Sequence, residues 1–435
     1  MDRITSLCKR RGFIFPSSEI YGGFESCYDY GPLGVELKNN IKKAWWKTMV
    51  QENENIVGLD SAILMNPKVW EASGHLSAGF ADNLVECKKC HKRFKETEIK
   101  EKCPICNGDF MPARKFNLMM KTFVGAVEDE SSITYLRAET CQGIYLNFKN
   151  VIDTSRQKIP FGIAQIGKAF RNEITPGNFI FRTREFEQME MQFLVHPKEA
   201  DKWFEHWREQ RLKWYLDLGI KKENLRLKDH DKKNLAHYAK AGADIEYHFP
   251  WGWQEIEGIH NRGDWDLSRH SQFSKQDLSY FNSETKEKFI PYIIETSAGV
   301  DRSLLIFLID AYEEVKGGRT TTTESIKESE TMLKLHQDLA PIKIAVLPLS
   351  KKDEITKPAK KIYDDLKKYF MAEYDETGSI GKRYRRHDEI GTPYCLTVDF
   401  ESLEDKKVTV RDRDTMVQKR IEISKLVEYF NAKLI

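Results

Sequence analysis

The sequence of 435 residues predicts a mixed α and β protein of two or three domains. Three observations lead to this prediction. The stretch from Gly167 to Val195 places charged residues inside apolar runs with a period of two, which indicates a β-hairpin. Two Cys-x-x-Cys pairs lie between residues 87 and 106. Beyond Pro341, short apolar strands alternate with helices, which is typical of an α/β module of about a hundred residues.

The overall composition describes a soluble globular protein. Apolar residues make up 40% of the chain and charged residues 31%. No apolar run approaches the roughly 20 residues that a membrane span requires. The N-terminal segment lacks the apolar core of a secretory signal, so we expect a cytoplasmic protein. Because the formal net charge is only +2, any surface for nucleic acid must come from local patches.

The first sixty residues predict a long helix. Pro32 suits its first turn, and apolar residues follow at helical spacing. These apolar residues are Leu37, Ile41, Ala44, Trp45 and Met49. Core packing is one interpretation of the stripe, and a contact between subunits is the other. We expect a strand over residues 60–67.

Four cysteines indicate a metal site. Cys87 and Cys90 are separated by twelve residues from Cys103 and Cys106. Two such pairs can place four thiolates tetrahedrally around zinc, and a cytosolic setting argues against disulfides. Because no His or Glu beside them supplies an open-site ligand, we expect a structural zinc ion, with coincidental thiols as the alternative. Cys8, Cys27, Cys141 and Cys395 occur singly and are expected to be packed.

The hairpin has two chemically different faces. Its first strand ends at residues 170–173, the turn is at 175–178, and the second strand runs from about Arg184 to Leu194. Met189, Met191 and Phe193 share one apolar face of the second strand. The other face carries Phe186, Gln188, Glu190 and Gln192.

The polar groups of this hairpin suit a bound nucleotide. The Arg171 guanidinium can donate two parallel hydrogen bonds to a phosphate. Glu173 can accept a hydrogen bond from an exocyclic amine, and Phe186 can stack on a purine. The connecting loop adds Arg182 and Arg184. A half-exposed hairpin with a solvated polar face is the alternative interpretation.

Later segments add three further expectations. Residues 197–240 have a helical pattern with many charges, which predicts an inserted helical hairpin. Glu255 and Glu257 occupy alternate positions of a strand and suggest a metal or amine ligand. An apolar strand from Ile290, a turn of small residues and an apolar helix place Arg302 at a helix start, beside backbone amides suited to phosphate.

The C-terminal part begins after a polar linker over residues 316–329. We expect strands over 342–347, 394–398 and 408–410, and helices around 359–370 and 421–430. The basic run from Lys382 to His387 contains an aromatic residue and could hold phosphates and stack a base. A solvated surface run is an equally good interpretation.

Together these motifs resemble the class II aminoacyl-tRNA synthetases. Residues Phe170-Arg171-Asn172-Glu173 with the loop 181–186 resemble motif 2, and FRTREFEQMEMQF resembles the glycine-specific members. Residues 31–67 are similar to motif 1. Residues 290–310 are similar to motif 3, with a shortened glycine run at Ser297-Ala298-Gly299. Residues 388–393 resemble the anticodon-binding domain of the glycine, histidine, proline and threonine enzymes.

The resemblance implies the architecture. It implies an α+β catalytic domain over 1–335, built on an antiparallel sheet flanked by helices, which is the class II synthetase fold. Within it we expect a zinc-knuckle insertion at about 85–110, motif 2 at 167–195 and a helical insertion at about 197–240. An α/β anticodon-binding domain follows over 336–435.

The resemblance also implies the site residues. The catalytic residues would be Arg171, Arg302 and Glu295. The ATP site would comprise Arg171, Asn172, Glu173, Phe181, Arg182, Arg184, Phe186, Glu255, Ile256, Gly299, Asp301 and Arg302. The glycine site would comprise Arg114, Glu139, Phe186, Gln188, Glu190, Arg262, Glu295, Ser297 and Gly299. Ala138 replaces the proline that usually precedes Glu139 in the family.

The implied activity is ATP-dependent and forms AMP. A homodimer would activate glycine with ATP and Mg²⁺ to glycyl-adenylate and pass glycine to the 3′ end of tRNA(Gly). Another class II synthetase, which would differ at Glu139, Glu190 and Ser297, is one alternative. An inactive, synthetase-like nucleic-acid-binding accessory protein should have lost Arg171 or Arg302, and both are present. A zinc-dependent nucleic-acid-binding protein would leave the carboxylate-rich strands unexplained.

Overall fold

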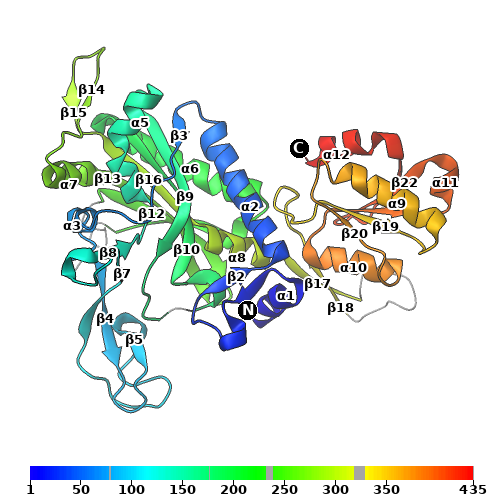
Figure 1. The fold of residues 1–435 in the computed structure, drawn as a ribbon, viewed down its shortest axis with the longest axis horizontal. Coiled ribbons are helices and arrows are strands. Elements are labelled where there is room, and N and C mark those ends of the chain that lie inside the picture. Colours follow the sequence, from blue (N-terminus) through cyan, green and yellow to red (C-terminus); the bar gives the residue numbers. More distant parts are fainter. Residues whose placement is uncertain (78–79, 176, 232–238, 318–328, 435) are drawn as a thin grey trace.

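The larger, N-terminal part of the chain is built on a seven-stranded sheet (Figure 1). The computed structural model describes residues 1–77, 80–175, 177–231, 239–317 and 329–434. Neighbouring strands are antiparallel except for β3 and β9, which are parallel. In spatial order the strands are β11 (Leu225–Asp229), β12 (Ala241–Phe249), β13 (Gly252–Gly263), β16 (Tyr292–Gly299), β10 (Glu185–Val195), β9 (Phe161–Phe170) and β3 (Ile56–Gly58). The expected antiparallel sheet is therefore present.

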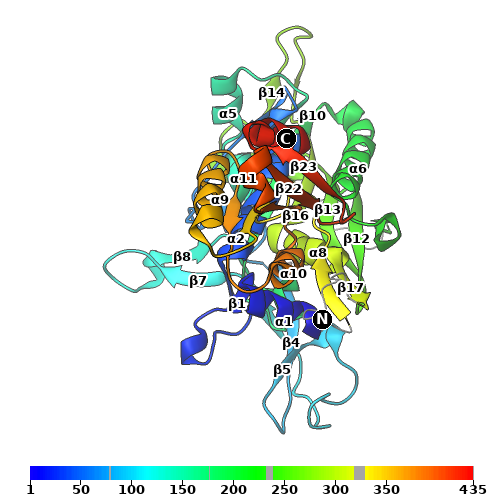
Figure 2. The same ribbon diagram turned by 90° about the vertical axis from the view of Figure 1, so that its right-hand side faces the viewer.

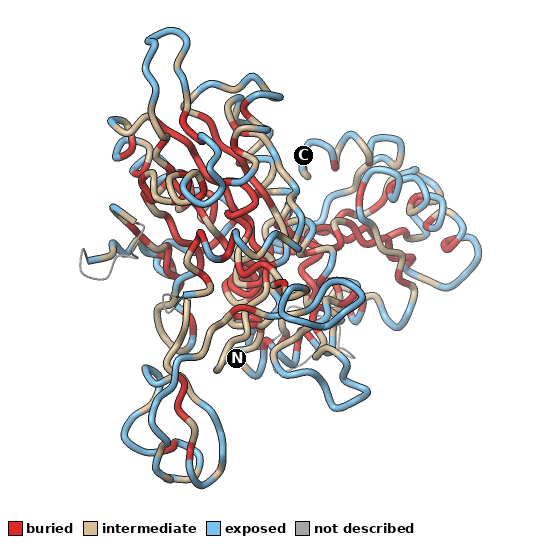
Figure 3. Tube along the Cα trace, turned by 60° about the vertical axis from the view of Figure 1, so that its left-hand side comes forward, coloured by how far each residue is buried: buried red, intermediate tan, exposed pale blue. Residues whose placement is uncertain are grey.

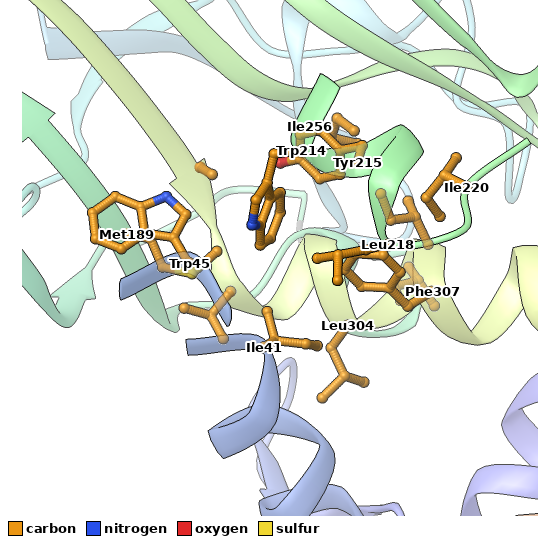
Figure 4. Close-up of a cluster of buried hydrophobic side chains, with 14 of the residues drawn as sticks. Ile41, Trp45, Met189, Trp214, Tyr215, Leu218, Ile220, Ile256, Leu304 and Phe307 are labelled. Atoms are coloured by element: carbon orange, nitrogen blue, oxygen red, sulfur yellow. The ribbon is translucent and has the colours of Figure 1, made fainter. Parts of the chain in front are cut away.

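Three helices cover one face of this sheet and form the main core. They are α2 (Pro32–Trp46), α6 (Ala200–Asp217) and α8 (Val300–Ala311). The apolar face of β10 supplies Met189, Met191 and Phe193 to this core. Figure 4 shows Met189 beside Trp45 of α2, with Trp214 of α6 nearby. The apolar stripe of α2 is thus buried within its own chain, as core packing predicts.

The opposite face divides into an apolar end and a polar end. Helices α4 (Cys141–Leu146), α5 (Phe148–Ser155) and α7 (Trp265–Ser274) lie over the apolar end, where they form a second cluster with Phe161, Ile163 and Leu194. Figure 3 shows buried backbone along the central strands on which both clusters rest. The polar end is left free to form a cavity.

The C-terminal domain is a separate α/β unit (Figure 2). Its core lies mainly between the sheet and α9 with α12, while α10 packs on the opposite face. The ion pairs of Arg10 and Arg11 with Glu389 join α1 to α10. The sheet order is β20 (Ala372–Tyr374), β19 (Ile344–Pro348), β21 (Tyr394–Val398), β22 (Lys407–Asp412) and β23 (Gln418–Glu422), and the helices are α9 (Asp353–Leu366), α10 (Ile380–Ile390), α11 (Glu401–Asp405) and α12 (Leu426–Leu434).

Smaller elements surround the large sheet. The region that contains the four paired cysteines lies below the sheet in Figure 1 and is built on the three strands β5, β4 and β6. The remaining bounds are α1 (Asp2–Arg11), β1 (Ile14–Pro16), β2 (Tyr28–Tyr30), α3 (Lys68–Ala72), β4 (Ala81–Glu86), β5 (Arg93–Lys95), β6 (Arg114–Asn117), β7 (Met120–Phe123), β8 (Ile133–Leu136), β14 (Tyr280–Phe281), β15 (Lys288–Phe289), β17 (Tyr312–Lys316) and β18 (Ser329–Leu333).

The strand expected over residues 60–67 was a wrong prediction. Regular pairing occurs earlier, in β3, and Leu64 makes only an isolated bridge to Leu136. Ser61 donates hydrogen bonds from its backbone N and its Oγ to Gln165 Oε1, at 3.0 and 2.8 Å. The Gln165 side chain thus satisfies the Ser61 backbone N–H, which a strand would pair with a neighbouring strand.

The helical hairpin expected over 197–240 was also partly wrong. Its first half is α6, but residues 225–229 form β11 at the edge of the large sheet. Leu225 is buried and Leu227 packs against the core, an alternation that suits a strand. Residues 232–238 lie outside the described residues, as do residues 318–328 of the expected linker. In the C-terminal domain, residues 421 and 422 end β23, and α12 begins only at Leu426.

Candidate active site

A cavity of about 260 Å³ opens at the polar end of the large sheet. Its floor is the polar face of β10, β13 and β16, and its walls are the 171–183 loop and the start of α8. The lining residues are Glu139, Arg171, Glu173, Ile180, Phe181, Arg182, Thr183, Phe186, Gln188, Glu190, Glu255, Ile256, Gly258, His260, Arg262, Glu295, Ser297, Gly299, Asp301 and Arg302. Most of the predicted site residues therefore line one cavity.

Three predicted residues lie outside this lining. Arg114 is exposed on β6 at the base of the knuckle, opposite Leu84. The backbone N of Asn172 donates to Leu118 O at 2.8 Å. Arg184 Nη1 donates to Glu25 O at 2.8 Å. These contacts hold the surrounding loops rather than the cavity floor.

Three buried carboxylates gather at the deep end of the cavity. Glu190 Oε1 and Glu295 Oε1 both accept from Gln192 Nε2 at 3.1 Å, so one amide bridges them. Thr140 Oγ1 donates to the other oxygen of Glu190. Glu139 accepts from Gln142 Nε2 at 2.8 Å. The cross-strand pairing of Gln192 with Glu295 sets this spacing.

Neighbouring basic side chains favour the ionised form of two of these carboxylates. Burial opposes ionisation of Glu139, but His75 and Arg262 keep the pKa of its carboxyl well below the ordinary value. Burial also opposes ionisation of Glu295. Arg262 and His260 nevertheless lower the pKa of this carboxyl to about 2, and Arg262 Nη1 lies 3.1 Å from Glu295 Oε2. Asp266 fixes the Arg262 guanidinium with hydrogen bonds of 2.7 and 2.9 Å.

The third carboxylate behaves in the opposite way. Burial, together with the negative charges of Glu295 and Glu139, raises the pKa of Glu190 well above the ordinary value. Without a neighbouring positive charge, Glu190 therefore favours its protonated form. A ligand that brings a positive charge can take the place of that proton, so this end of the cavity is suited to an ammonium group.

The outer end of the cavity is cationic and aromatic. The Arg171 guanidinium lies 5.4 Å from the centre of the Phe186 ring, and its Nε donates to Ala138 O at 3.1 Å. Arg302, in the first turn of α8, lies 4.5 Å from the Phe181 ring and donates from Nη1 to Glu255 O at 3.0 Å. Two guanidiniums beside aromatic rings form a suitable site for a polyphosphate with a base.

Two predicted acids are committed to structural contacts. Asp301 accepts from the backbone N of Glu187 at 2.8 Å and pairs with Lys38 at 3.1 Å. Simple alternation predicts that Glu255 and Glu257 share a face of β13. In the structure they do not. A bulge at Ile256 shifts the register of β13, so Glu257 turns into the core side and pairs with Arg211 of α6 at 2.6 Å.

The sequence interpretation missed several residues of the site. Ile180, Thr183, Gly258 and His260 line the cavity, and His75, Thr140 and Gln192 support its carboxylates. Gln192 was placed on the polar face of the hairpin, so its alternation was a usable signal. His75 contacts Glu139 from a distant segment, and no local pattern indicates this contact.

The four cysteines of the knuckle converge as predicted. The Sγ atoms of Cys87 and Cys106 are 3.4 Å apart, those of Cys90 and Cys103 are 3.6 Å apart, and all four lie within 4.8 Å of one another. Thiolates around a tetrahedral zinc ion are separated by about 3.8 Å. The donor set and its spacing therefore fit one structural zinc ion.

The basic run of the C-terminal domain lies on α10. Arg383 is buried and donates from Nη1 to Pro348 O at 2.6 Å, and His387 is fully buried. Arg386 pairs with Asp375. Only part of this run is thus available to a ligand, and Lys382 is exposed.

Comparisons with known proteins agree with this fold. A model of the tRNA synthetase class II core domain (G, H, P, S and T) matches residues 125–311, and an anticodon binding domain model matches residues 343–433. A crystal structure of prolyl-tRNA synthetase from Cryptosporidium parvum, complexed with halofuginone and AMPPNP, has a TM-score of 0.66 at 16% identity. The match covers 99% of this chain and 76% of that one, and it shows the fold.

Curated relatives are similar over the whole chain. Glycine–tRNA ligases from Acetivibrio thermocellus and Borreliella burgdorferi are 56% and 55% identical, and that from Thermobifida fusca is 52% identical. Each match covers 100% of this chain and 98% of the relative.

The antiparallel sheet, the C-terminal domain and the matching family models define a class II aminoacyl-tRNA synthetase. The identity over the full length is more specific than this class. The chain belongs to the glycine–tRNA ligase family. Among the described residues, no helix is long and apolar enough to cross a membrane.

Proposed function

We propose that the deep end of the cavity binds the ammonium group of glycine and that the outer end binds ATP. The observation that supports this most directly is the carboxylate trio with one raised pKa, because Glu139, Glu190 and Glu295 together match a single positive charge. Glycine offers no side chain to hold, so its affinity has to come from its charged groups. Ser297, which accepts from Gln188 Nε2 at 3.1 Å, narrows the space beyond Cα.

The reaction then requires no protein nucleophile. A carboxylate oxygen of glycine attacks the α-phosphorus of ATP, and the bond to pyrophosphate breaks. Arg171 neutralises charge on the α-phosphate, Arg302 holds the γ-phosphate, and Phe186 and Glu173 hold the adenine. Catalysis is therefore positioning and charge neutralisation. The adenylate next transfers glycine to the terminal ribose of tRNA(Gly), which the C-terminal domain would help to bind.

Mg²⁺ belongs with the phosphates in this proposal. Bound Mg²⁺ would neutralise charge on the departing pyrophosphate. Glu255 suits the role of a Mg²⁺ ligand because its side chain is half exposed at the cavity. Its Oε1 atom lies 3.6 Å from Arg302 Nη1, near the proposed phosphate site. Glu295 is already paired with Arg262 and lies at the deep end, so we place it with the glycine ammonium.

We further propose that the enzyme works as a homodimer. The apolar stripe of α2 is buried within the chain and is not the contact. Ile20 and Tyr21 are 89% and 86% exposed in the loop between β1 and β2, and Phe24 adds a third exposed apolar side chain. Clustered exposed apolar residues are typical of protein interfaces, so this loop is a candidate contact.

Substrate choice provides the test of the proposed pocket. Pyrophosphate exchange into ATP, measured with all twenty amino acids, should require glycine in the unaltered enzyme. Ser297→Gly removes volume beyond Cα, and we expect it to admit alanine, with a gain of roughly tenfold in kcat/KM for alanine relative to glycine. Thr331→Gly, on β18 and outside the cavity lining, is the matched control. Continued exclusion of alanine by Ser297→Gly would contradict the pocket assignment.

The zinc site has a test of its own. We expect one zinc ion per chain in protein purified without chelators, and Cys103→Ser should lose this zinc ion and unfold the knuckle locally. Metal analysis and limited proteolysis of residues 85–110 measure the two effects. Cys395→Ser, which removes a buried thiol of the C-terminal domain, should retain the zinc. Freshly prepared protein without zinc would refute the site.

A further inference from the structure

A second group of metal-ligating side chains lies beside the active-site cavity. His230 follows β11, Asp244 lies on β12 and His260 lies on β13. Each offers one ligand atom, and the three atoms lie within 4.8 Å of one another. Only His260 also lines the cavity. The role proposed above for the cavity does not use His230 or Asp244.

The register of the sheet brings these side chains together. His230 N donates to Gly242 O at 2.9 Å, Gly242 is paired with His260, and Asp244 is paired with Gly258. Residues paired across two strands share a face of the sheet, and so do residues two positions apart on one strand. The ligands therefore converge on the cavity side of the sheet without any loop rearrangement.

Two glycines provide the space for the imidazole rings. A Cβ atom at Gly242 would lie 2.9 Å from His230 Nδ1 and 2.9 Å from His260 Cδ2. A Cβ atom at Gly258 would lie 2.8 Å from His260 Cε1. Any larger residue at either position would displace a ring. The imidazoles thus occupy space that only glycine leaves open.

The carboxylates around the rings complete the arrangement. His230 Nε2 lies 2.7 Å from Asp244 Oδ2, and His260 Nδ1 lies 3.2 Å from Glu295 Oε2. His260 Nδ1 is buried and has no hydrogen-bond partner among the described residues, although the Glu295 carboxylate lies beside it. Histidines that bind metals usually have such a carboxylate behind them.

We propose that His230, Asp244 and His260 form a mononuclear site for a divalent transition metal such as Zn²⁺ or Co²⁺. Two imidazoles and one carboxylate suit these ions better than Mg²⁺ or Ca²⁺, which prefer oxygen ligands. When an ion binds between them, the distance from His230 Nε2 to Asp244 Oδ2 would increase to about 3 Å. The side chains are 23%, 15% and 17% exposed, which leaves a route for the ion and room for water ligands.

Metal titration of the full-length protein tests this proposal. The protein is first loaded with zinc at the four cysteines and then titrated with Co²⁺ by calorimetry, with metal analysis after gel filtration. We expect a second equivalent whose cobalt spectrum lacks the intense thiolate charge-transfer bands. His230→Gln and Asp244→Asn should each weaken this second binding at least tenfold. His248→Gln, on β12 but packed against Trp253, should leave it unchanged.

A chemical measurement on the unaltered protein makes the test independent of the variants. Bound Co²⁺ should protect His230 and His260, but not His248, from diethyl pyrocarbonate, as mapped by mass spectrometry. The absence of a second equivalent would overturn the proposal and leave an ordinary ion pair between His230 and Asp244. Unchanged binding in both folded variants, or unchanged modification of the two histidines, would also overturn it.

Discussion

Replacing Arg171 by alanine is expected to reduce kcat/KM for glycine-dependent pyrophosphate exchange by roughly 150-fold, which corresponds to about 3 kcal/mol of transition-state stabilisation. The carbonyl of Ala138 and the ring of Phe186 orient the Arg171 guanidinium. The alanine substitution therefore removes a preorganised positive charge at the place where negative charge builds up on the α-phosphate in the proposed reaction. The effect should appear mainly in kcat.

Two further substitutions sharpen this prediction. Arg171→Lys keeps the charge but loses the planar fork, so we expect it to recover only part of the rate. Arg93→Ala removes an exposed arginine of the knuckle and should leave exchange unchanged. Unaltered exchange in Arg171→Ala, with the fold verified by circular dichroism, would exclude Arg171 from the mechanism.

Glu190→Gln is expected to raise the KM for glycine by roughly 30-fold, because a charge-assisted hydrogen bond to the ammonium is worth about 2 kcal/mol. The KM for ATP should change little, since Glu190 lies at the deep end of the cavity. Glu185→Gln, on the same strand but paired with Lys168 at the surface, is the matched control. Equal changes in both KM values would argue against the assignment of the ammonium site.

The pH dependence of glycine binding follows from the same residue. Burial and the neighbouring carboxylates raise the pKa of Glu190, and in our proposal glycine binds the ionised form of this residue. Binding should therefore release a proton, and the affinity for glycine should fall as the pH falls through that raised pKa. Calorimetry in buffers of different ionisation enthalpy measures the proton. Glu190→Gln should abolish the proton release, and its persistence in that variant would assign the titration to another group.

The sequence predicted the parts of the site that depend on local patterns. The two faces of β10 follow from a strict alternation, so Met189 in the core and Glu190 in the cavity were both placed correctly. The four cysteines were recognisable because their spacing is itself the structural requirement. The position of Arg302 followed from a strand, a turn and a helix that are contiguous in the chain.

The parts that could not be predicted depend on distant contacts. The bulge at Ile256 reverses the side of Glu257, and its partner Arg211 lies on a helix more than one element away. Strand β11 is short and charged, so only its pairing with β12 distinguishes it from the preceding helix. The environment that separates the pKa of Glu190 from that of Glu295 likewise exists only after β10 and β16 pair.

The position of β16 in the sheet determines the order in which the enzyme can form. This strand is central, between β13 and β10, yet it follows both of them in the chain. During synthesis, the hairpin of β9 and β10 has to wait for about a hundred further residues before its neighbouring strand emerges from the ribosome. Until then Met189, Met191 and Phe193 have no helix α8 to cover them. The nascent chain therefore presents an unpaired strand edge, with an apolar face that only α2 and α6 can cover, and such a chain is a typical substrate for a chaperone. Neither glycine nor ATP can stabilise it before Arg302 has been added.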